Sequence, residues 1–87
     1  MIPIRARLEN SAVTFGCWVT IGSPHSAEIV GQAGFDWVII DTQHGGLAEA
    51  QLLPMFQALD LTGTPALVRV PWNDEALIMR AADLGAA

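Results

Sequence analysis

Residues 35–41, FDWVIID, form a nearly continuous apolar run that ends in an aspartate. Alternating apolar and polar residues are typical of a strand with one solvated face, whereas an unbroken apolar run indicates a strand covered on both faces. Two further segments, 13–21 and 65–71, are rich in β-branched and other apolar residues and predict two more strands. Together these segments constrain the chain to a sheet of parallel strands that are joined through helices.

The segments between the predicted strands carry the signals that begin and end helices. Ser23 is placed to cap a helix that has Pro24 at its first position and Gly34 at its far end. A second helix is expected within 48–60. Pro54 marks either its start or a kink, because proline lacks the backbone N–H that a helix interior needs.

A short leading helix is expected over 4–10, and a last helix over 73–85 has acidic residues in its first turn and Gly85 after its end. The alternation of strands and helices predicts an α/β fold with right-handed crossovers. A doubly wound nucleotide-binding fold would carry a G-x-G-x-x-G motif after the first strand, and the segment 20–26, TIGSPHS, lacks it. A (β/α) barrel is therefore the better fit, although the strand pattern alone separates the two folds poorly.

Charge and composition exclude several functions. The 87-residue chain has a net charge of −5, and its four cationic residues are all arginine. It therefore has neither the basic surface of a nucleic-acid-binding protein nor a lysine for a Schiff base. No apolar run is long enough for a membrane span or a signal peptide, and the lone Cys17 allows no internal disulfide. A cytoplasmic protein without membrane contact is expected.

Polar and aromatic side chains follow the predicted strands at their C-terminal ends, where barrel enzymes place their chemistry. Trp18 lies near the end of the first strand, Asp41 and His44 follow the second, and Arg69 lies at the end of the third, so all are expected at one rim. An arginine inside an apolar strand needs an anion or a carboxylate beside it. Each residue also has a purely structural interpretation: Asp41 as a loop cap, His44 as an exposed turn residue, Arg69 as an ion-pair partner and Trp18 as a core residue.

Three stretches carry a resemblance to a known family: GCWVTIGSPHSAEIVGQAGFDWVIIDTQHGG at 16–46, ALVRVPWND at 66–74 and RAADLGAA at 80–87. In order and spacing they resemble the opening third of the HpcH/HpaI aldolase family, whose members include 4-hydroxy-2-oxoheptanedioate aldolase and 2-dehydro-3-deoxyglucarate aldolase. The resemblance implies a class II aldolase on a TIM barrel, with a divalent metal (Mg, Mn or Co), that cleaves or forms a 4-hydroxy-2-oxo acid through a pyruvate enolate. It also implies pyruvate and an aldehyde as partners, and a homo-oligomer at full length.

The resemblance assigns roles to the matching positions. His44 is implied as the base that works through a metal-bound water, and Arg69 as the group that holds the pyruvyl oxygens and stabilises the enolate. Asp41 is implied as an acceptor that orients His44 or the metal-bound water, and Trp18 as a substrate-binding residue. Asp83 matches the family aspartate that pairs with the histidine. Because Asp83 would lie at the opposite rim of its own barrel, this pair is expected to form between subunits.

Two features depart from the family pattern. Gln43 stands where many members carry a glutamate before the histidine. The family's metal ligands, a glutamate and an aspartate from later strands, are expected beyond Ala87. Residues 1–87 are thus expected to be the N-terminal part of a single aldolase barrel domain, truncated before the fourth strand and inactive alone. The alternatives are a related 2-oxo-acid lyase or synthase and a non-catalytic barrel fragment that acts as an interaction module. Asp83 also has a structural interpretation, as a helix-end residue.

Overall fold

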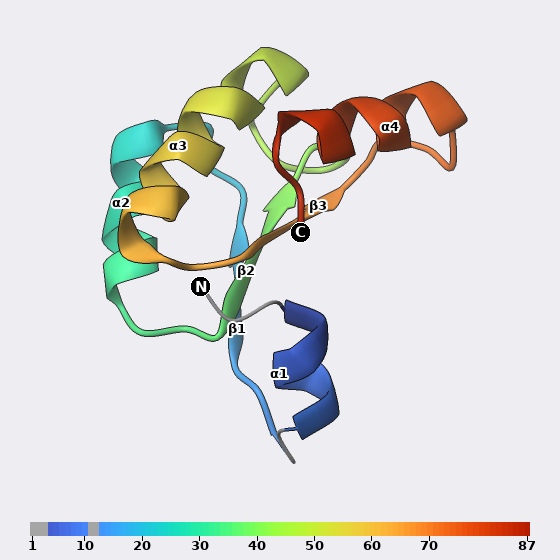
Figure 1. Ribbon diagram of the computed structural model, residues 1–87. Helices are drawn as coiled ribbons and strands as arrows, with labels where there is room; N and C mark the ends of the chain where they lie inside the picture. The colour runs from blue at the N-terminus through green and yellow to red at the C-terminus, as the bar shows by residue number, and fades with distance from the viewer. Residues whose placement is uncertain (1–3, 11–12) are drawn as a thin grey trace.

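The computed structural model describes residues 4–10 and 13–87 (Figure 1). Every predicted strand and helix is present, and a short 3-10 helix precedes the helix predicted within 48–60. In chain order the elements are α1 (Ile4–Asn10), β1 (Gly16–Val19), α2 (Pro24–Gln32), β2 (Trp37–Asp41), η1 (Glu49–Gln51), α3 (Leu52–Thr62), β3 (Ala66–Arg69) and α4 (Glu75–Leu84). The predicted α/β class is confirmed.

The three strands form one parallel sheet in the order β1-β2-β3. Each is shorter than the segment predicted for it. Ahead of β2, the carboxylate of Asp36 accepts a hydrogen bond from the backbone N–H of Phe15 at 2.8 Å. The register places Trp18 opposite Ile39 and Asp41 opposite Arg69. The last residues of β2 and β3 therefore lie side by side.

The helices lie where the sequence predicts them, except that α3 extends to Thr62, beyond the predicted 48–60, because its end is set by Gly63 with φ of +71°. The Ser23 hydroxyl caps α2 by accepting a backbone N–H of its first turn at 3.3 Å. Pro54 lies in the first turn of α3, where N–H groups have no partner within the helix, so it belongs to the start of this helix and not to its interior. The Asp74 carboxylate caps α4 by accepting the Leu77 N–H at 3.0 Å. Gly85, with φ of +132°, follows its last residue.

The two faces of the sheet differ in what covers them. One face packs against α2 and α3, which lie on the same side of the sheet (Figure 1), and the core there includes Val38, Ile40, Met55 and Leu59, each at most 1% exposed. Burying a side chain of this kind contributes about 1.5–3 kcal/mol. Side chains alternate along a strand. The opposite face therefore carries Trp18, Ile39, Asp41, Leu67 and Arg69.

Helix α1 lies near the end of the sheet at which the strands begin (Figure 1). Its Arg7 donates a hydrogen bond from Nη1 to the carbonyl oxygen of Asp36 at 3.3 Å, just before β2. This contact leaves the other end of the sheet, where the strands finish, free of α1. Within residues 4–10 and 13–87, no helix is long and apolar enough to cross a membrane.

Apolar surface flanks both outer strands of the sheet. Beside β3, the Ala87 N–H donates to the Ala66 carbonyl oxygen at 2.8 Å, which repeats the bond from the Val38 N–H to the Pro65 carbonyl across the β2–β3 pair at 3.1 Å. A hollow of about 240 Å³ lies between β3 and α4, and another of about 110 Å³ lies beside β1 and α2. The outer side of β3 thus forms a backbone hydrogen bond with the residue that follows α4 and Gly85 by two positions.

Candidate active site at the carboxyl ends of the strands

Three of the predicted site residues come together where the strands end. The indole of Trp18, on β1, donates a hydrogen bond from Nε1 to Oδ2 of Asp41, on β2, at 2.9 Å. The guanidinium carbon of Arg69, on β3, lies 5.9 Å from the centre of the Trp18 ring. Each strand therefore contributes one side chain to a single cluster, as expected for parallel strands whose C-terminal ends share one edge.

Asp41 is the buried member of this cluster, with only 2% of its surface exposed. Its Oδ1 accepts the backbone N–H groups of Gln43 and His44, both at 2.9 Å, while Oδ2 accepts the Trp18 indole. The hydrogen bond from the His44 backbone, followed by that from the Trp18 indole, lowers the pKa of Asp41 from 3.8 to about 2 against the opposing effect of burial. The nearby charge of Arg69 lowers this pKa further in the same direction.

The geometry of Asp41 confirms its interpretation as a loop cap. The implied contact with His44 exists as well, but it is made to the main chain of His44 and not to its imidazole ring. Asp41 therefore holds the backbone of the turn that carries His44. Trp18 as a core residue is wrong, because its side chain lies on the face away from α2 and α3 and the residue is 52% exposed.

Arg69 is exposed, and its guanidinium lies near an aromatic ring instead of a carboxylate. Among the described residues no ion pair includes Arg69, so its interpretation as an ion-pair partner is not borne out there. The backbone of Arg69 is held firmly, since its carbonyl oxygen accepts both the N–H of Thr42 at 3.0 Å and the hydroxyl of Thr42 at 2.6 Å. A fixed strand end thus carries a guanidinium whose donors face outward.

The turn after β2 is fastened by residues that the sequence analysis did not single out for this purpose. Thr42 binds the end of β3, and the side-chain amide of Gln43 donates from Nε2 to the carbonyl oxygen of Pro71 at 3.2 Å. At Gly45 a Cβ atom would collide with the carbonyl oxygen of Asp41, so the tight turn requires glycine. The Gly-Gly pair that ends DTQHGG was the available sequence signal for this close approach.

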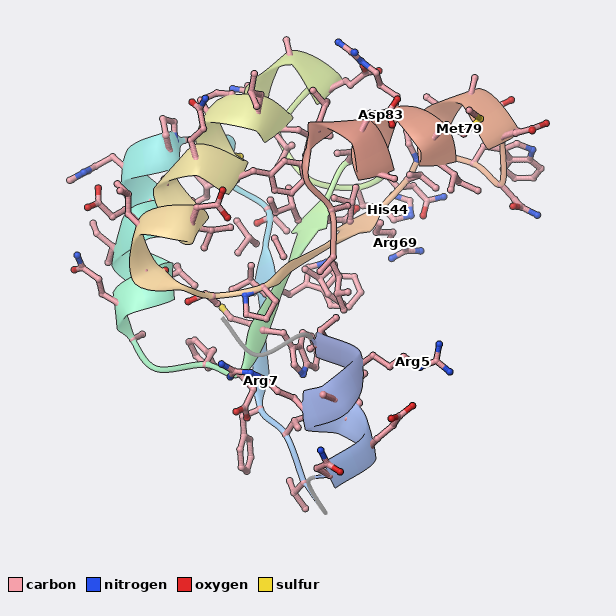
Figure 2. The ribbon with its side chains drawn as sticks, in the orientation of Figure 1. Arg5, Arg7, His44, Arg69, Met79 and Asp83 are labelled. Carbon is pink, nitrogen blue, oxygen red and sulfur yellow. The ribbon has the colours of Figure 1, made fainter. Side chains whose placement is uncertain are left out.

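His44 and Asp83 do not meet within one chain. His44 is an exposed turn residue, as its structural interpretation has it, whereas Asp83 is exposed on α4 (Figure 2). In the described part of the chain, neither side chain forms a hydrogen bond or an ion pair. A pair between His44 and Asp83 of different subunits stays a prediction.

The described residues do not fit a divalent metal on their own. No group of three or more histidine, cysteine, aspartate or glutamate side chains within residues 4–10 and 13–87 lies close enough to hold an ion. The Asp41 oxygens already accept three N–H groups, which removes the most buried carboxylate from the available ligands. We therefore derive no step of the chemistry through a metal held by these residues.

A parallel α/β sheet with an acid, an arginine and a histidine at the carboxyl ends of its strands is the arrangement found in enzymes built from βα units. Residues 14–87 match the sequence model of the HpcH/HpaI aldolase/citrate lyase family, and the chain belongs to this family.

Similar proteins are longer than this chain. The 5-keto-4-deoxy-D-glucarate aldolases of Klebsiella pneumoniae subsp. pneumoniae and Salmonella paratyphi A are 37% identical over 81 residues, which cover 93% of this chain and 32% of each relative. A solved HpcH/HpaI family protein from Burkholderia cenocepacia J2315 matches with a TM-score of 0.83 and 30% identity over 95% of this chain and 34% of that one. The citrate synthase SbnG matches with a TM-score of 0.88 and 27% identity over 99% and 35%. The chain thus spans about a third of the length of these relatives.

Proposed function

We propose that this chain supplies the first three βα units of a (β/α)8 aldolase that cleaves or forms a 4-hydroxy-2-oxo acid through a pyruvate enolate. The family and the named aldolase relatives support a lyase. The observation that carries the proposal is the exposed Arg69 guanidinium, held at the carboxyl end of β3 without a carboxylate partner in the described residues.

Arg69 is suited to hold a 2-oxo acid. Its planar guanidinium presents parallel N–H donors that match two oxygens of a carboxylate, or one carboxylate oxygen and the neighbouring oxo group. When the bond to the aldehyde carbon breaks, negative charge develops on the oxo oxygen of the pyruvyl part. A fixed cationic donor at that position stabilises this charge more in the transition state than in the substrate.

His44 is proposed as the base. Aldol cleavage removes the proton of the 4-hydroxyl group while the carbon–carbon bond breaks, and the reverse reaction returns it. His44 is exposed at the same end of the sheet as Arg69, and histidine is the side chain that most often serves as a general base in enzymes. In the assembled enzyme we propose that Asp83 of another subunit orients this ring. Any divalent metal would be held by side chains outside the described residues.

Deuterium uptake into the methyl group of pyruvate, followed by NMR in the full-length enzyme that contains this chain, tests the role of Arg69. Arg69→Lys is expected to lose most of the exchange and most of the aldol cleavage, because lysine keeps the charge but not the two-pronged donor. Arg5→Lys is the matched control, since Arg5 lies on α1 with its side chain 89% exposed. A folded Arg69→Lys enzyme that exchanges protons at the parent rate would contradict the proposal; circular dichroism reports the folding.

A second candidate is a carbon–carbon synthase or lyase that acts on a different 2-oxo acid. The TM-score of 0.88 to the citrate synthase SbnG favours keeping it, because that relative shares the fold of these units. The two candidates differ in the 2-oxo acid that the enzyme accepts as substrate. Proton exchange with pyruvate, but not with longer 2-oxo acids, supports the aldolase. The absence of any turnover with either would favour a non-catalytic interaction module.

A further inference from the structure

Four contacts hold the ends of the three strands and the turn after β2 in one arrangement. The Asp41 carboxylate accepts the Trp18 indole on one oxygen and the Gln43 and His44 backbone N–H groups on the other, and the Trp18 ring lies next to the Arg69 guanidinium. We propose that Asp41 and Trp18 are positioning residues: the carboxylate fixes the indole, and the indole ring holds the Arg69 guanidinium so that its N–H donors remain free for an anion. The part of this proposal that leaves the Arg69 donors free for an anion rests on the function proposed above for Arg69.

Asp41 lies beside Arg69 but does not form an ion pair with it in the described residues. Asp41 and Arg69 are register partners on adjacent strands, so a direct ion pair between them is the simplest expectation. That pair is absent from the described residues. Three N–H groups, each 2.9 Å away, already occupy the two carboxylate oxygens. The carboxylate is thus engaged by neutral donors, and the arginine is left with its hydrogen-bonding capacity unused.

The Trp18 ring provides a partner that attracts a cation without accepting its N–H groups. A guanidinium within about 6 Å of an indole centre is attracted by the negative face of the ring, and the 5.9 Å separation meets this condition. A hydrogen bond from the indole N–H to a carboxylate increases the electron density of the ring, which strengthens that attraction. The rotation of the ring, and with it the place of the guanidinium, therefore depends on Asp41.

Asparagine cannot reproduce the role of Asp41. Its side chain has one acceptor oxygen and one NH₂ group, whereas the site presents N–H donors on both sides. In Asp41→Asn either the indole or the turn backbone must lose its acceptor. Phenylalanine at position 18 would keep an aromatic face but donate nothing, and leucine would remove the face as well. These three variants separate the carboxylate, the indole N–H and the ring.

The experiment is NMR of the ¹⁵N-labelled chain, with the indole Nε1–H of Trp18 and the Nε–H of Arg69 as reporters. In the parent chain the Trp18 indole proton is expected downfield of that of Trp72, which is 74% exposed, because it binds a carboxylate. Asp41→Asn should move it toward the Trp72 position and should remove the ring-current shift from Arg69. Trp18→Phe should keep part of the Arg69 shift, and Trp18→Leu should abolish it. Trp72→Phe and Asp60→Asn, at exposed positions, are the matched controls.

Unchanged Trp18 and Arg69 resonances in a folded Asp41→Asn chain would overturn the proposal. Equal Arg69 shifts in Trp18→Phe and Trp18→Leu would overturn the part assigned to the ring, and these variants decide the matter if Asp41→Asn does not fold. Titration with pyruvate of the full-length enzyme that contains this chain is the second readout: the Arg69 Nε–H should respond in the parent enzyme, with a several-fold weaker affinity in Asp41→Asn. If neither enzyme responds to pyruvate, the proposed function of Arg69 fails, while the indole resonance still decides the positioning role.

Discussion

Asp41 carries a buried negative charge without a cationic side chain bonded to it. The cost of burying a carboxylate is offset here by three N–H donors, which together hold its pKa at about 2. The carboxylate is therefore ionised at neutral pH. It also makes the turn after β2 sensitive to acid.

The stability of the chain should fall in acid through Asp41. Its pKa is about 2 in the folded chain and 3.8 ordinarily, so the contribution to stability is fully present above about pH 4 and is lost as the pH falls through 2. The measurement is the free energy of unfolding of the parent and of Asp41→Asn, from urea titrations at several pH values. The difference between the two should shrink from pH 5 toward pH 2. A difference that stays constant over this range would contradict the role of the ionised carboxylate.

Gln43 donates to the Pro71 carbonyl, a bond that an ionised glutamate cannot make because it has no N–H. Gln43→Glu should therefore destabilise the chain at pH 7 by about 0.5–1.5 kcal/mol, the usual contribution of one hydrogen bond. Part of this loss should return below about pH 4, where the glutamate is protonated. Gln57→Glu, at an exposed position of α3, should leave the unfolding free energy nearly unchanged. Equal effects at the two positions would show that the bond to Pro71 does not matter.

The sequence was sufficient to predict which residues gather at this edge, but not which of them bind each other. Trp18, Asp41 and Arg69 end three parallel strands, so their convergence follows from the fold alone. The absence of an Asp41–Arg69 ion pair depends on the turn over 42–45, whose backbone N–H groups point back at Asp41. That turn requires the close approach at Gly45, a tertiary feature that no periodicity in the sequence reports.

At the scale of elements, α4 is held less by its surroundings than α2 and α3, which bury more of their residues. Only Ala81 is buried along it, Ile78 and Met79 are exposed, and a hollow separates part of it from β3. The stability of α4 therefore depends more on the interactions at its ends. By comparison, α3 buries five side chains. The ends are well specified, with the Asp74 carboxylate at the start and Gly85 after the last residue.

Removal of the cap should destabilise the chain. Asp74→Ala leaves the Leu77 N–H without its acceptor and should lower the free energy of unfolding by about 1 kcal/mol, the usual effect of losing an N-cap. Asp74→Asn keeps an acceptor oxygen and should retain most of the stability. Both are measured by urea denaturation, with loss of helical circular dichroism as the signal. If Asn and Ala have the same effect, the capping bond is not what stabilises α4.

At the scale of the whole molecule, the sheet is covered on one face and flanked by apolar hollows at both edges. The Ala87–Ala66 bond shows that backbone groups on the outer side of β3 are available for hydrogen bonding. The curated relatives, of which this chain spans 32%, have the additional length that such segments require. A complete barrel would cover both edges and place further side chains opposite the Trp18–Asp41–Arg69 cluster.

The chain alone should bind Mg²⁺ or Mn²⁺ no better than a generic acidic surface, because its described residues hold no cluster of ligands. Titration calorimetry of the 87-residue chain is the measurement, and a stoichiometric micromolar site would contradict the expectation. Metal-dependent aldol cleavage should appear only when the chain is combined with the remaining βα units of the enzyme. The remaining units alone, at the same concentration, are the control.

The central place of β2 has a consequence for how the backbone opens to water. Both neighbours of β2 are parallel strands, and each is linked to it through a helical connection, so its amide groups are freed only when β1 or β3 separates from it. The outward-facing amides of β1 have no such protection from the sheet. Hydrogen exchange should therefore be slowest in Trp37–Asp41 and should report the opening of the whole sheet there. Asp41, at the end of this strand, would then belong to the segment of the chain that opens last.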